Sequence, residues 1–379
     1  MSTPLHEVGR PGSSPDCWSY IIMMIAYGVC ARRTGVFEMT DLPDHNRQMV
    51  LRERPKGNVS DDNFELVTGP VPTAGAGELL LRNRWLSFDP AQRGWINDIR
   101  SYVPPVAIGE PMRGYGLGEV VTSDVEGISV GQLVHCKIDW QDYVVVDPSK
   151  DATFEAVPDG MADPTLLLGV LGLTGLTAYF GMTEIGRPGE GDTVLVTAAA
   201  GATGSVAGQI ARIKGASRVI GTAGAPDKRA WVTDVAGFDD CLDHYDEKVR
   251  RKLFDAAPKG YNVIYDNVGG SLLDACIFNA AVNARIVLCG AISTGYRPEK
   301  PEVGLHFYQL LTTRSARMEG FLVSNYEDQY ARARADLAGW VADGSLHHEL
   351  DVLEGLENAP EGLRRLFAGK NLGKQALKL

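Results

Sequence analysis

A strand, a glycine-containing turn and a helix in direct succession constrain the fold of this chain most. Thr193–Thr197 reads TVLVT, a β-branched run typical of a buried strand, and a helical pattern follows over Ser205–Lys214. The turn between them fits the dinucleotide fingerprint, with Ala199 in the first glycine position. Its glycines permit close approach of a pyrophosphate and of the helix, whose N-terminus offers N–H groups to the anion. We expect the cofactor to contact four residues of this turn: Gly201, Ala202, Thr203 and Gly204.

The segments after this turn continue to alternate between strand and helix. Further β-branched runs occupy Arg218–Thr222, Asn262–Asn267 and Arg285–Cys289. The helical patterns between them cover Asp227–Val235, Glu247–Ala257 and Ser271–Ala281. This alternation predicts an α/β fold with a doubly wound parallel sheet, the Rossmann arrangement. It favours a dinucleotide site over a turn whose small residues serve packing alone.

A different pattern precedes the Rossmann region. Short strand-like runs separated by Gly, Pro and Asp turns predict a mostly antiparallel β unit. These runs are Gln48–Glu53, Phe64–Thr68, Glu78–Asn83, Gly118–Ser123, Gln132–Lys137 and Gln141–Val146. An apolar helical stretch, Pro164–Tyr179, leads into the Rossmann region. The chain ends with a strand at Met318–Val323, helices at Glu327–Asp343 and from Pro360 to about Gly369, and a strand at Lys374–Leu379.

The end of the second Rossmann strand indicates which nicotinamide cofactor binds. NAD enzymes place an acidic residue there for the ribose hydroxyls, but this chain has Thr222-Ala223-Gly224. Lys228 and Arg229 follow within a turn. A missing carboxylate and nearby cations suit a 2′-phosphate, so we expect NADPH. The alternative for Lys228 is an ordinary solvated lysine at the start of a helix.

Charge and cysteine usage exclude several classes of protein. Of the 379 residues, 37 are Lys or Arg and 48 are Asp or Glu, which gives a net charge of −11 and an isoelectric point near 5.2. This balance argues against a nucleic-acid-binding protein and against a polybasic membrane protein. The six cysteines form no C-x-x-C pair, so we expect a cytoplasmic protein without a zinc lobe or a redox pair.

Residues 1–44 stand apart from the rest of the chain. Trp18–Ala31 is apolar but has only 14 residues, short of the ~20 that a spanning helix needs, and only Arg10 precedes it as a basic residue. We interpret residues 1–44 as an appendage, with Met39 or Met49 as alternative starts of the working protein. A membrane tether at Trp18–Ala31 is the less favoured alternative.

The β unit lacks the ligands of a zinc alcohol dehydrogenase. It offers only His45, His135 and Cys136, and the last two take opposite faces of one strand. We therefore expect no metal, and hydride transfer then needs another donor to stabilise an oxyanion. Tyrosine is the natural candidate. Three tyrosines lie in Gly- or Pro-rich loops: Tyr102, Tyr115 and Tyr296.

Several blocks, in order along residues 48–379, resemble one known family. They include SFDPAQRG from Ser87, SYVPP from Ser101, MRGYG from Met112, GLTGLTAY from Gly172, YDNVGG from Tyr265, CGAIS from Cys289, EGFLV from Glu319 and GKNLGKQ from Gly369. With the phosphate turn, these blocks resemble the zinc-independent medium-chain dehydrogenases/reductases. The similar branch is that of prostaglandin reductase and leukotriene 12-hydroxydehydrogenase, which includes plant alkenal double-bond reductases.

This resemblance implies a two-domain architecture and an activity. It implies a GroES-like β domain over 45–170, a Rossmann domain over 171–319 and a C-terminal segment, 320–379, that returns to the first domain. The active site would lie in the cleft between the domains. The implied reaction adds a hydride from NADPH to the β-carbon of α,β-unsaturated aldehydes and ketones, and the implied assembly is a homodimer.

The resemblance also assigns roles to individual residues. Tyr296 resembles the tyrosine that faces the substrate carbonyl together with a ribose hydroxyl, and Tyr102 and Tyr115 resemble tyrosines of the substrate pocket. Lys228 resembles the lysine that meets the 2′-phosphate. The other expected cofactor contacts are Thr177, His244, Tyr245, Asn267 and Asn371.

Two departures from the family pattern accompany these assignments. Two residues, Thr294 and Gly295, separate Ser293 from Tyr296 where the family usually has one. A position after the third strand that is usually tyrosine is His244 here, with Tyr245 beside it, and either could serve the 2′-phosphate. A histidine there would make cofactor affinity fall as pH rises, whereas the alternative is a surface histidine in a loop.

These observations lead to a functional hypothesis with two alternatives. Hydride addition leaves an enolate, whose oxygen would accept hydrogen bonds from Tyr296 and from the ribose hydroxyl. The α-carbon would then be protonated by solvent or by a proton relayed from a tyrosine. The first alternative is a zinc-independent quinone oxidoreductase with the same fold. The second is a non-catalytic NADPH-binding protein, which only the shifted Tyr296 favours.

Overall fold

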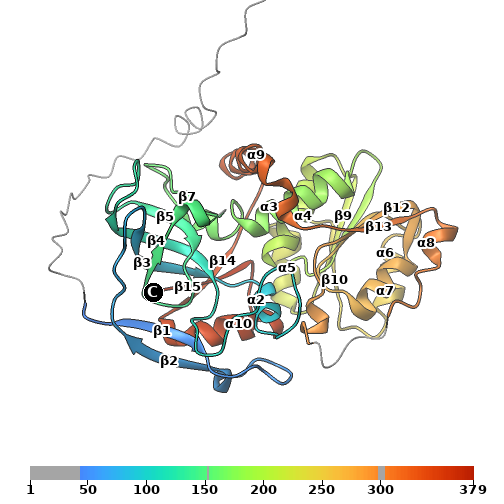
Figure 1. The fold of residues 1–379 in the computed structure, drawn as a ribbon. Coiled ribbons are helices and arrows are strands. Elements are labelled where there is room, and N and C mark those ends of the chain that lie inside the picture. The colour runs from blue at the N-terminus through green and yellow to red at the C-terminus, as the bar shows by residue number, and fades with distance from the viewer. Residues whose placement is uncertain (1–42, 152, 298–303) are drawn as a thin grey trace, which may run out of the picture.

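The computed structural model describes residues 43–151, 153–297 and 304–379, which form two domains side by side (Figure 1). The stretch Trp18–Ala31 and the alternative start at Met39 lie outside the described residues. Within the described ranges, no helix is both long and apolar enough to cross a membrane.

The first domain is built on a mostly antiparallel sheet, as its strand pattern predicts. Seven strands belong to it: β14 and β15 from the C-terminus, which pair parallel, then β3, β4, β5 and β7 in that order, and β6, which pairs with the first half of β3. The strands from the first half of the chain are β3 (Leu79–Ser87), β4 (Tyr115–Ser123), β5 (Leu133–Lys137), β6 (Tyr143–Val146) and β7 (Glu155–Ala156). A separate pair, β1 (Asn46–Leu51) and β2 (Phe64–Gly69), and the short helix α2 (Ala91–Trp95) complete this part.

The start of β4 differs from its prediction by three residues. The strand begins at Tyr115, which pairs with Ser87 of β3 and with Lys137 of β5. Gly116 hides this extension from the sequence, because glycine has a low strand propensity. A Cβ at Gly116 would overlap the Trp85 carbonyl, so close packing of the two backbones requires a glycine there.

The second domain is a doubly wound parallel sheet, which confirms the predicted Rossmann fold. Its order is β10-β9-β8-β11-β12-β13, which is 3-2-1-4-5-6 when its strands are counted along the chain. The strands are β8 (Thr193–Val196), β9 (Arg218–Ala223), β10 (Asp240–Asp243), β11 (Tyr261–Asp266), β12 (Ala280–Leu288) and β13 (Arg317–Gly320). In such a sheet the ligand crevice lies where the order reverses, here at the carboxyl ends of β8 and β11.

Helices cover both faces of this sheet. The side chains of β8 alternate between them, with Val194 and Val196 in one core cluster and Leu195 in the other. The first face carries α3 (Leu173–Phe180), α4 (Ala202–Ile213), α5 (Pro226–Asp234) and α9 (Tyr330–Ala342). The second carries α6 (Val249–Ala256), α7 (Gly270–Phe278) and α8 (Leu310–Thr313).

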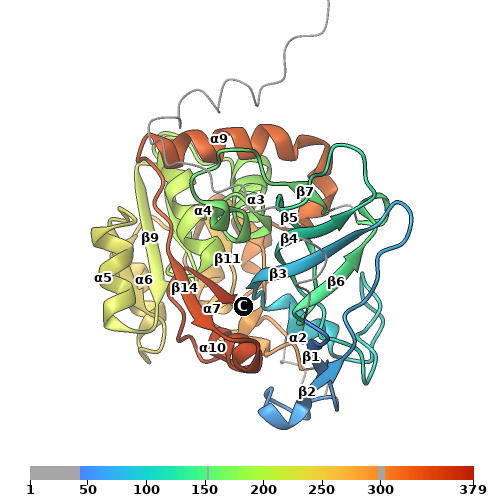
Figure 2. The ribbon, with the colours of Figure 1, turned by 90° about the vertical axis from the view of Figure 1, so that its left-hand side faces the viewer.

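The C-terminal part of the chain crosses between the domains. Helix α9 packs against α3, and the chain then joins the first domain's sheet through β14 (Leu350–Glu354) and β15 (Lys374–Lys378). The helix between these two strands is α10 (Ala359–Phe367). Figure 2 shows these red C-terminal strands beside the blue β3, with which β15 pairs antiparallel. One apolar cluster includes Leu117 of β4 and Ala376 of β15 together with the Rossmann core, so the domains share buried surface.

The first described strand is anchored by a buried amide. Asn46 is 2% exposed, and its Nδ2 donates to the Tyr143 carbonyl at 3.0 Å while its Oδ1 accepts the Tyr143 N–H at 2.9 Å. These two bonds join the start of β1 to the start of β6, as a pair of backbone hydrogen bonds between strands would. A chain that began at Met49 would lack Asn46 and the first half of β1.

Replacing this amide should destabilise the first domain. We expect Asn46→Ala to lower the free energy of unfolding by about 1–3 kcal/mol, because both partner groups on Tyr143 would be left buried without a bond. Thermal and urea unfolding measure the change, with the exposed neighbour His45→Ala as the matched control. Equal stability of the two variants would contradict this anchoring role.

Candidate functional site

The phosphate turn has the geometry of an anion-binding strand–helix junction. Ala198 lies in the left-handed region with φ of 51°, and its carbonyl accepts the Gly201 N–H at 2.9 Å. A Cβ on Gly204 would overlap that same carbonyl, which explains the glycine there. No side chain in the described part of the chain caps α4, which begins at Ala202. The N–H groups of its first turn are therefore available to a ligand.

Lys228, His244 and Tyr245 gather beside the ends of β9 and β10. Lys228 Nζ donates to the Gly369 carbonyl at 2.8 Å, and partial burial lowers the pKa of this lysine. The Tyr245 ring lies against Gly224, and its centroid is 4.2 Å from that of His244. His244 and Tyr245 therefore lie, with Lys228, at the carboxyl ends of β9 and β10, where the sequence predicts the 2′-phosphate.

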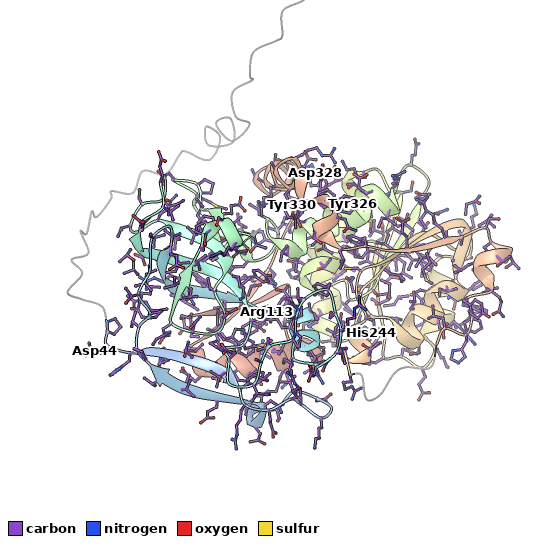
Figure 3. All side chains as sticks on the ribbon, in the orientation of Figure 1. Asp44, Arg113, His244, Tyr326, Asp328 and Tyr330 are labelled. Atoms are coloured by element: carbon purple, nitrogen blue, oxygen red, sulfur yellow. The ribbon has the colours of Figure 1, made fainter. Side chains whose placement is uncertain are left out.

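His244 carries a polar atom that the protein leaves unused. Its Nδ1 is buried and has no hydrogen-bond partner among the described residues. Burial lowers its pKa, and the nearby charges of Lys228 and Arg229 act in the same direction, against the opposing effect of Asp243. Figure 3 labels His244, which follows β10 directly. His244 is half-buried in a turn, so its contact with the 2′-phosphate stays a prediction.

Asn267 belongs to a buried polar network at the carboxyl ends of β8 and β11. Its Nδ2 donates to the Thr197 carbonyl at 2.7 Å, and its N–H donates to Thr197 Oγ1 at 2.8 Å. The Thr197 hydroxyl donates in turn to Asp266 Oδ1 at 2.8 Å. Burial raises the pKa of Asp266, while bonds from Thr197 and two backbone N–H groups oppose the rise. The network fixes the loop where the strand order reverses.

Asn371 lies in a C-terminal loop that docks on the phosphate turn. The Gly373 N–H donates to the Ala200 carbonyl at 2.8 Å, and Gly201 and Gly373 form an isolated parallel bridge. Asn371 Nδ2 donates to the Gly373 carbonyl at 2.9 Å and so stabilises this loop. The structure thereby brings Asn371 to the predicted dinucleotide turn.

Thr177 lies on α3 and is engaged within the protein. Its hydroxyl donates to the Leu173 carbonyl at 2.6 Å, and its own carbonyl accepts the Tyr265 hydroxyl at 2.9 Å. These bonds hold α3 against β11. Its contact with a cofactor stays a prediction.

Tyr296 lies in a tight loop after β12, and both sides of its backbone are held. Gly295 and Tyr296 are both left-handed, with φ of 62° and 49°. The ring returns over the start of the loop, where the Tyr296 hydroxyl accepts the Ala291 N–H at 3.3 Å. Burial raises the pKa of this phenol, so it stays protonated at neutral pH. Of the two residues between Ser293 and Tyr296, Gly295 is the left-handed one.

Tyr102 and Tyr115 meet at the indole of Trp95. Trp95 Nε1 donates to the Tyr102 hydroxyl at 2.9 Å, and the Tyr115 ring packs edge-on against Trp95 at 6.1 Å. Burial raises the pKa of Tyr115 to about 12, whereas Tyr102 is 61% exposed. The structure thus brings Tyr102 and Tyr115 together through Trp95.

Sequence reasoning missed Trp95 and the cation above it. The Arg113 guanidinium lies 5.7 Å from the Trp95 ring centroid and donates to the Pro104 carbonyl at 2.8 Å. Arg113 lies near the middle of the molecule in Figure 3. The signal was the position of Trp95 just after the SFDPAQRG block, but only the folded chain shows that it joins two tyrosines.

The metal-ligating residues of the first domain are not arranged as a site. Across residues 43–151, 153–297 and 304–379, no three His, Cys, Asp or Glu side chains group closely enough to hold a metal ion. His135 and Cys136 are both buried in β5. Burial lowers the pKa of His135 to about 4 and raises that of the Cys136 thiol, which fits packed interior residues.

Comparison with known proteins identifies the family. One family model, described as the N-terminal domain of oxidoreductase, matches residues 47–154, and another, described as zinc-binding dehydrogenase, matches 202–338. NADPH-dependent curcumin reductase of Escherichia coli is 38% identical over 338 residues, which is 88% of this chain and 97% of that protein. The chain belongs to the medium-chain dehydrogenase/reductase family.

Further relatives place this medium-chain reductase within its branch. The NADP-dependent 2-alkenal reductase of Nicotiana tabacum is 34% identical and covers 88% of this chain and 97% of its own. Prostaglandin reductase 1 of Rattus norvegicus is 35% identical, with coverage of 87% and 98%. These relatives confirm the predicted prostaglandin reductase and alkenal reductase branch.

A solved relative shares the whole fold. CurA from Vibrio vulnificus, whose structure contains NADPH, is 38% identical, and it covers 88% of this medium-chain reductase and 98% of its own chain at a TM-score of 0.83. The predicted fold class is therefore confirmed.

Proposed function

We propose that this protein uses NADPH to reduce the carbon–carbon double bond of α,β-unsaturated aldehydes and ketones. The observation that carries the proposal is the Tyr296 hydroxyl, which accepts the Ala291 N–H and keeps its own proton for donation. The names of its relatives support the reaction class, since 2-alkenal reductase acts on such a substrate.

The residues present fit NADPH. The uncapped start of α4 suits the pyrophosphate, and the buried Nδ1 of His244 next to Lys228 suits a 2′-phosphate. Lys228 already donates to Gly369, but an ammonium has three donors and can bond a phosphate as well. When bound, NADPH supplies the hydride.

The protein's own contribution is to hold a proton donor where negative charge develops. Hydride addition at the β-carbon shifts the alkene π electrons into a bond between the α-carbon and the carbonyl carbon, and the carbonyl π electrons move onto oxygen. The resulting enolate then takes up a proton at the α-carbon from solvent. The Tyr296 phenol, with a raised pKa, donates to that oxygen without surrendering its proton. Accepting the Ala291 N–H strengthens this donation, because hydrogen bonds in a chain polarise one another.

The aromatic group around Trp95 suits the substrate side of the cleft. Trp95 and Tyr115 offer apolar faces, and Tyr102 is exposed beside them. A conjugated, planar substrate stacks well on such rings. We assign Tyr102 and Tyr115 to substrate binding.

An assay of NADPH oxidation tests the proposed reaction. We expect purified protein to oxidise NADPH, followed at 340 nm, when 2-alkenals or enones are added, and to use NADH poorly. A quinone serves as the control for a quinone oxidoreductase. Turnover with quinones alone, or cofactor binding without any turnover, would overturn the proposal.

Removal of the Tyr296 hydroxyl should impair chemistry and spare binding. We expect Tyr296→Phe to lower kcat by ~10²–10³, the usual cost of one oxyanion donor, with an unchanged Kd for NADPH. Steady-state kinetics and NADPH fluorescence provide the two readouts. Undiminished turnover would exclude Tyr296 and direct attention to Tyr102 or Tyr115.

Lys228 should determine the preference between the two cofactors. We expect Lys228→Ala to raise the KM for NADPH by about 10- to 100-fold, the usual effect of losing a charge-assisted bond, and to leave the KM for NADH nearly unchanged. Lys248→Ala, at an exposed lysine, is the control. Equal effects on NADPH and NADH would mean that Lys228 does not contact the 2′-phosphate.

His244 should make NADPH affinity depend on pH. Its lowered pKa keeps the ring neutral in the free protein at pH 7, and a bound phosphate dianion would raise that pKa, so binding takes up a proton. We expect the Kd for NADPH to rise by about tenfold between pH 5.5 and 8, since one unit of pKa corresponds to that factor. His244→Asn should flatten the profile, whereas Tyr245→Phe should not. The same slope in wild type and His244→Asn would contradict the role of His244.

A further inference from the structure

A buried side-chain amide from the first domain holds the backbone of Tyr296. Asn97, just after α2, is 9% exposed, and its Nδ2 donates to the Tyr296 carbonyl at 2.7 Å. The two residues are separated by 199 positions and belong to different domains. This bond therefore ties the loop that carries the Tyr296 phenol to the domain that carries Trp95.

The orientation of this amide is fixed by its other partner. Asn97 Oδ1 accepts from Arg93, a residue that is 1% exposed and that also donates to the Gly57 carbonyl at 2.9 Å. A guanidinium can only donate, so the amide oxygen must face Arg93 and the NH₂ group must face Tyr296. The chain from Gly57 through Arg93 and Asn97 to Tyr296 thus has one arrangement of donors and acceptors.

Tyr296 has a backbone conformation that needs such support. A non-glycine residue with φ of 49° is strained and persists only where its surroundings hold it. Its N–H donates to Thr294 Oγ1 at 3.0 Å within its own loop, while its carbonyl is held by Asn97 from the other domain. Its ring also contacts Phe367 of α10 edge-on at 6.3 Å. The first domain therefore constrains both the backbone and the ring of Tyr296.

We infer that Asn97 is a positioning residue for catalysis, which sets the Tyr296 hydroxyl relative to the substrate side of the cleft. The inference rests on the proposed role of Tyr296 as the donor to the substrate oxygen. Helix α2 and the residues just after it then organise both sides of the reaction, since Trp95 orders Tyr102 and Tyr115 and Asn97 orders Tyr296.

An isosteric substitution isolates this function. Asn97→Asp keeps an oxygen for Arg93 but turns a second oxygen toward the Tyr296 carbonyl, so a hydrogen bond becomes a repulsion between two acceptors. We expect kcat for a 2-alkenal to fall by about 10- to 100-fold, the range that small misplacements of a catalytic group produce, with unchanged KM for the alkenal and unchanged Kd for NADPH. Asp98→Asn, at an exposed neighbour, is the matched control and should keep full kcat. Thermal melting checks the fold, and if Asn97→Asp unfolds, Asn97→Ser removes the reach to Tyr296 without adding a charge.

A double-mutant cycle with Tyr296→Phe decides whether Asn97 acts through the phenol. The inference expects the Asn97 substitution to cost little further kcat once the Tyr296 hydroxyl is absent. An equal loss in both backgrounds, or no loss in the single variant while Tyr296→Phe is impaired, would overturn the role of Asn97 and leave the proposed function standing. Full turnover by Tyr296→Phe would overturn the role of Tyr296 and the inference with it, and absence of turnover in the wild type would overturn the proposed function itself.

Discussion

The loop between α10 and β15 is the contact on which the candidate site depends. Within six residues it reaches both domains: the Gly369 carbonyl accepts from Lys228, the Gly373 N–H donates to Ala200, and the Lys374 ammonium pairs with Asp89 at 2.6 Å. Lys374 is 4% exposed and also donates to the Phe88 carbonyl at 3.0 Å. A buried charge with these partners is costly to separate, so the loop fixes how the phosphate turn faces the first domain.

The docking of this loop between the two domains determines which residues come together at the candidate site. The reversal of strand order between β8 and β11 opens the Rossmann sheet at the phosphate turn, and the docked loop brings Asn371 and Gly373 over it. The loop after β12 then brings Tyr296 toward the first domain, where Asn97 holds its carbonyl. Under the proposed function, cofactor binding and donation to the substrate rely on two separate hydrogen-bonded connections between the same pair of domains. Only the hydrogen bond from Asn97 involves Tyr296, the residue that we propose as the donor to the substrate.

Much of the fold could be predicted from the sequence because its strands are β-branched and its turns are rich in glycine. The strand β10 had no such signal, since its sequence DCLD is acidic and only Cys241 is buried. It forms because its backbone pairs with β9, a tertiary contact that overrides propensity. The strand β14 itself was not predicted for a similar reason, since none of its five side chains is fully buried.

The candidate site also contains some residues that a local sequence pattern indicates and others that only tertiary contacts reveal. The strand–turn–helix geometry of the phosphate turn could be predicted because a local pattern specifies it, and the role of Lys228 stays a prediction. Trp95 and Asn97 could not, because their partners are Tyr102, Tyr115 and Tyr296, and the last lies 199 residues from Asn97. Residues that act by holding another residue leave no local pattern in one sequence, and only the folded chain brings the pairs together.

The position of the transferred hydrogen tests the central claim most directly. NADPH deuterated at C4 would be incubated with the protein and a 2-alkenal, and the product would be analysed by NMR and mass spectrometry. The account predicts a saturated aldehyde with one deuterium on the carbon β to an intact carbonyl. Deuterium on the carbinol carbon of an allylic alcohol would contradict it, because the protein would then reduce the carbon–oxygen double bond instead.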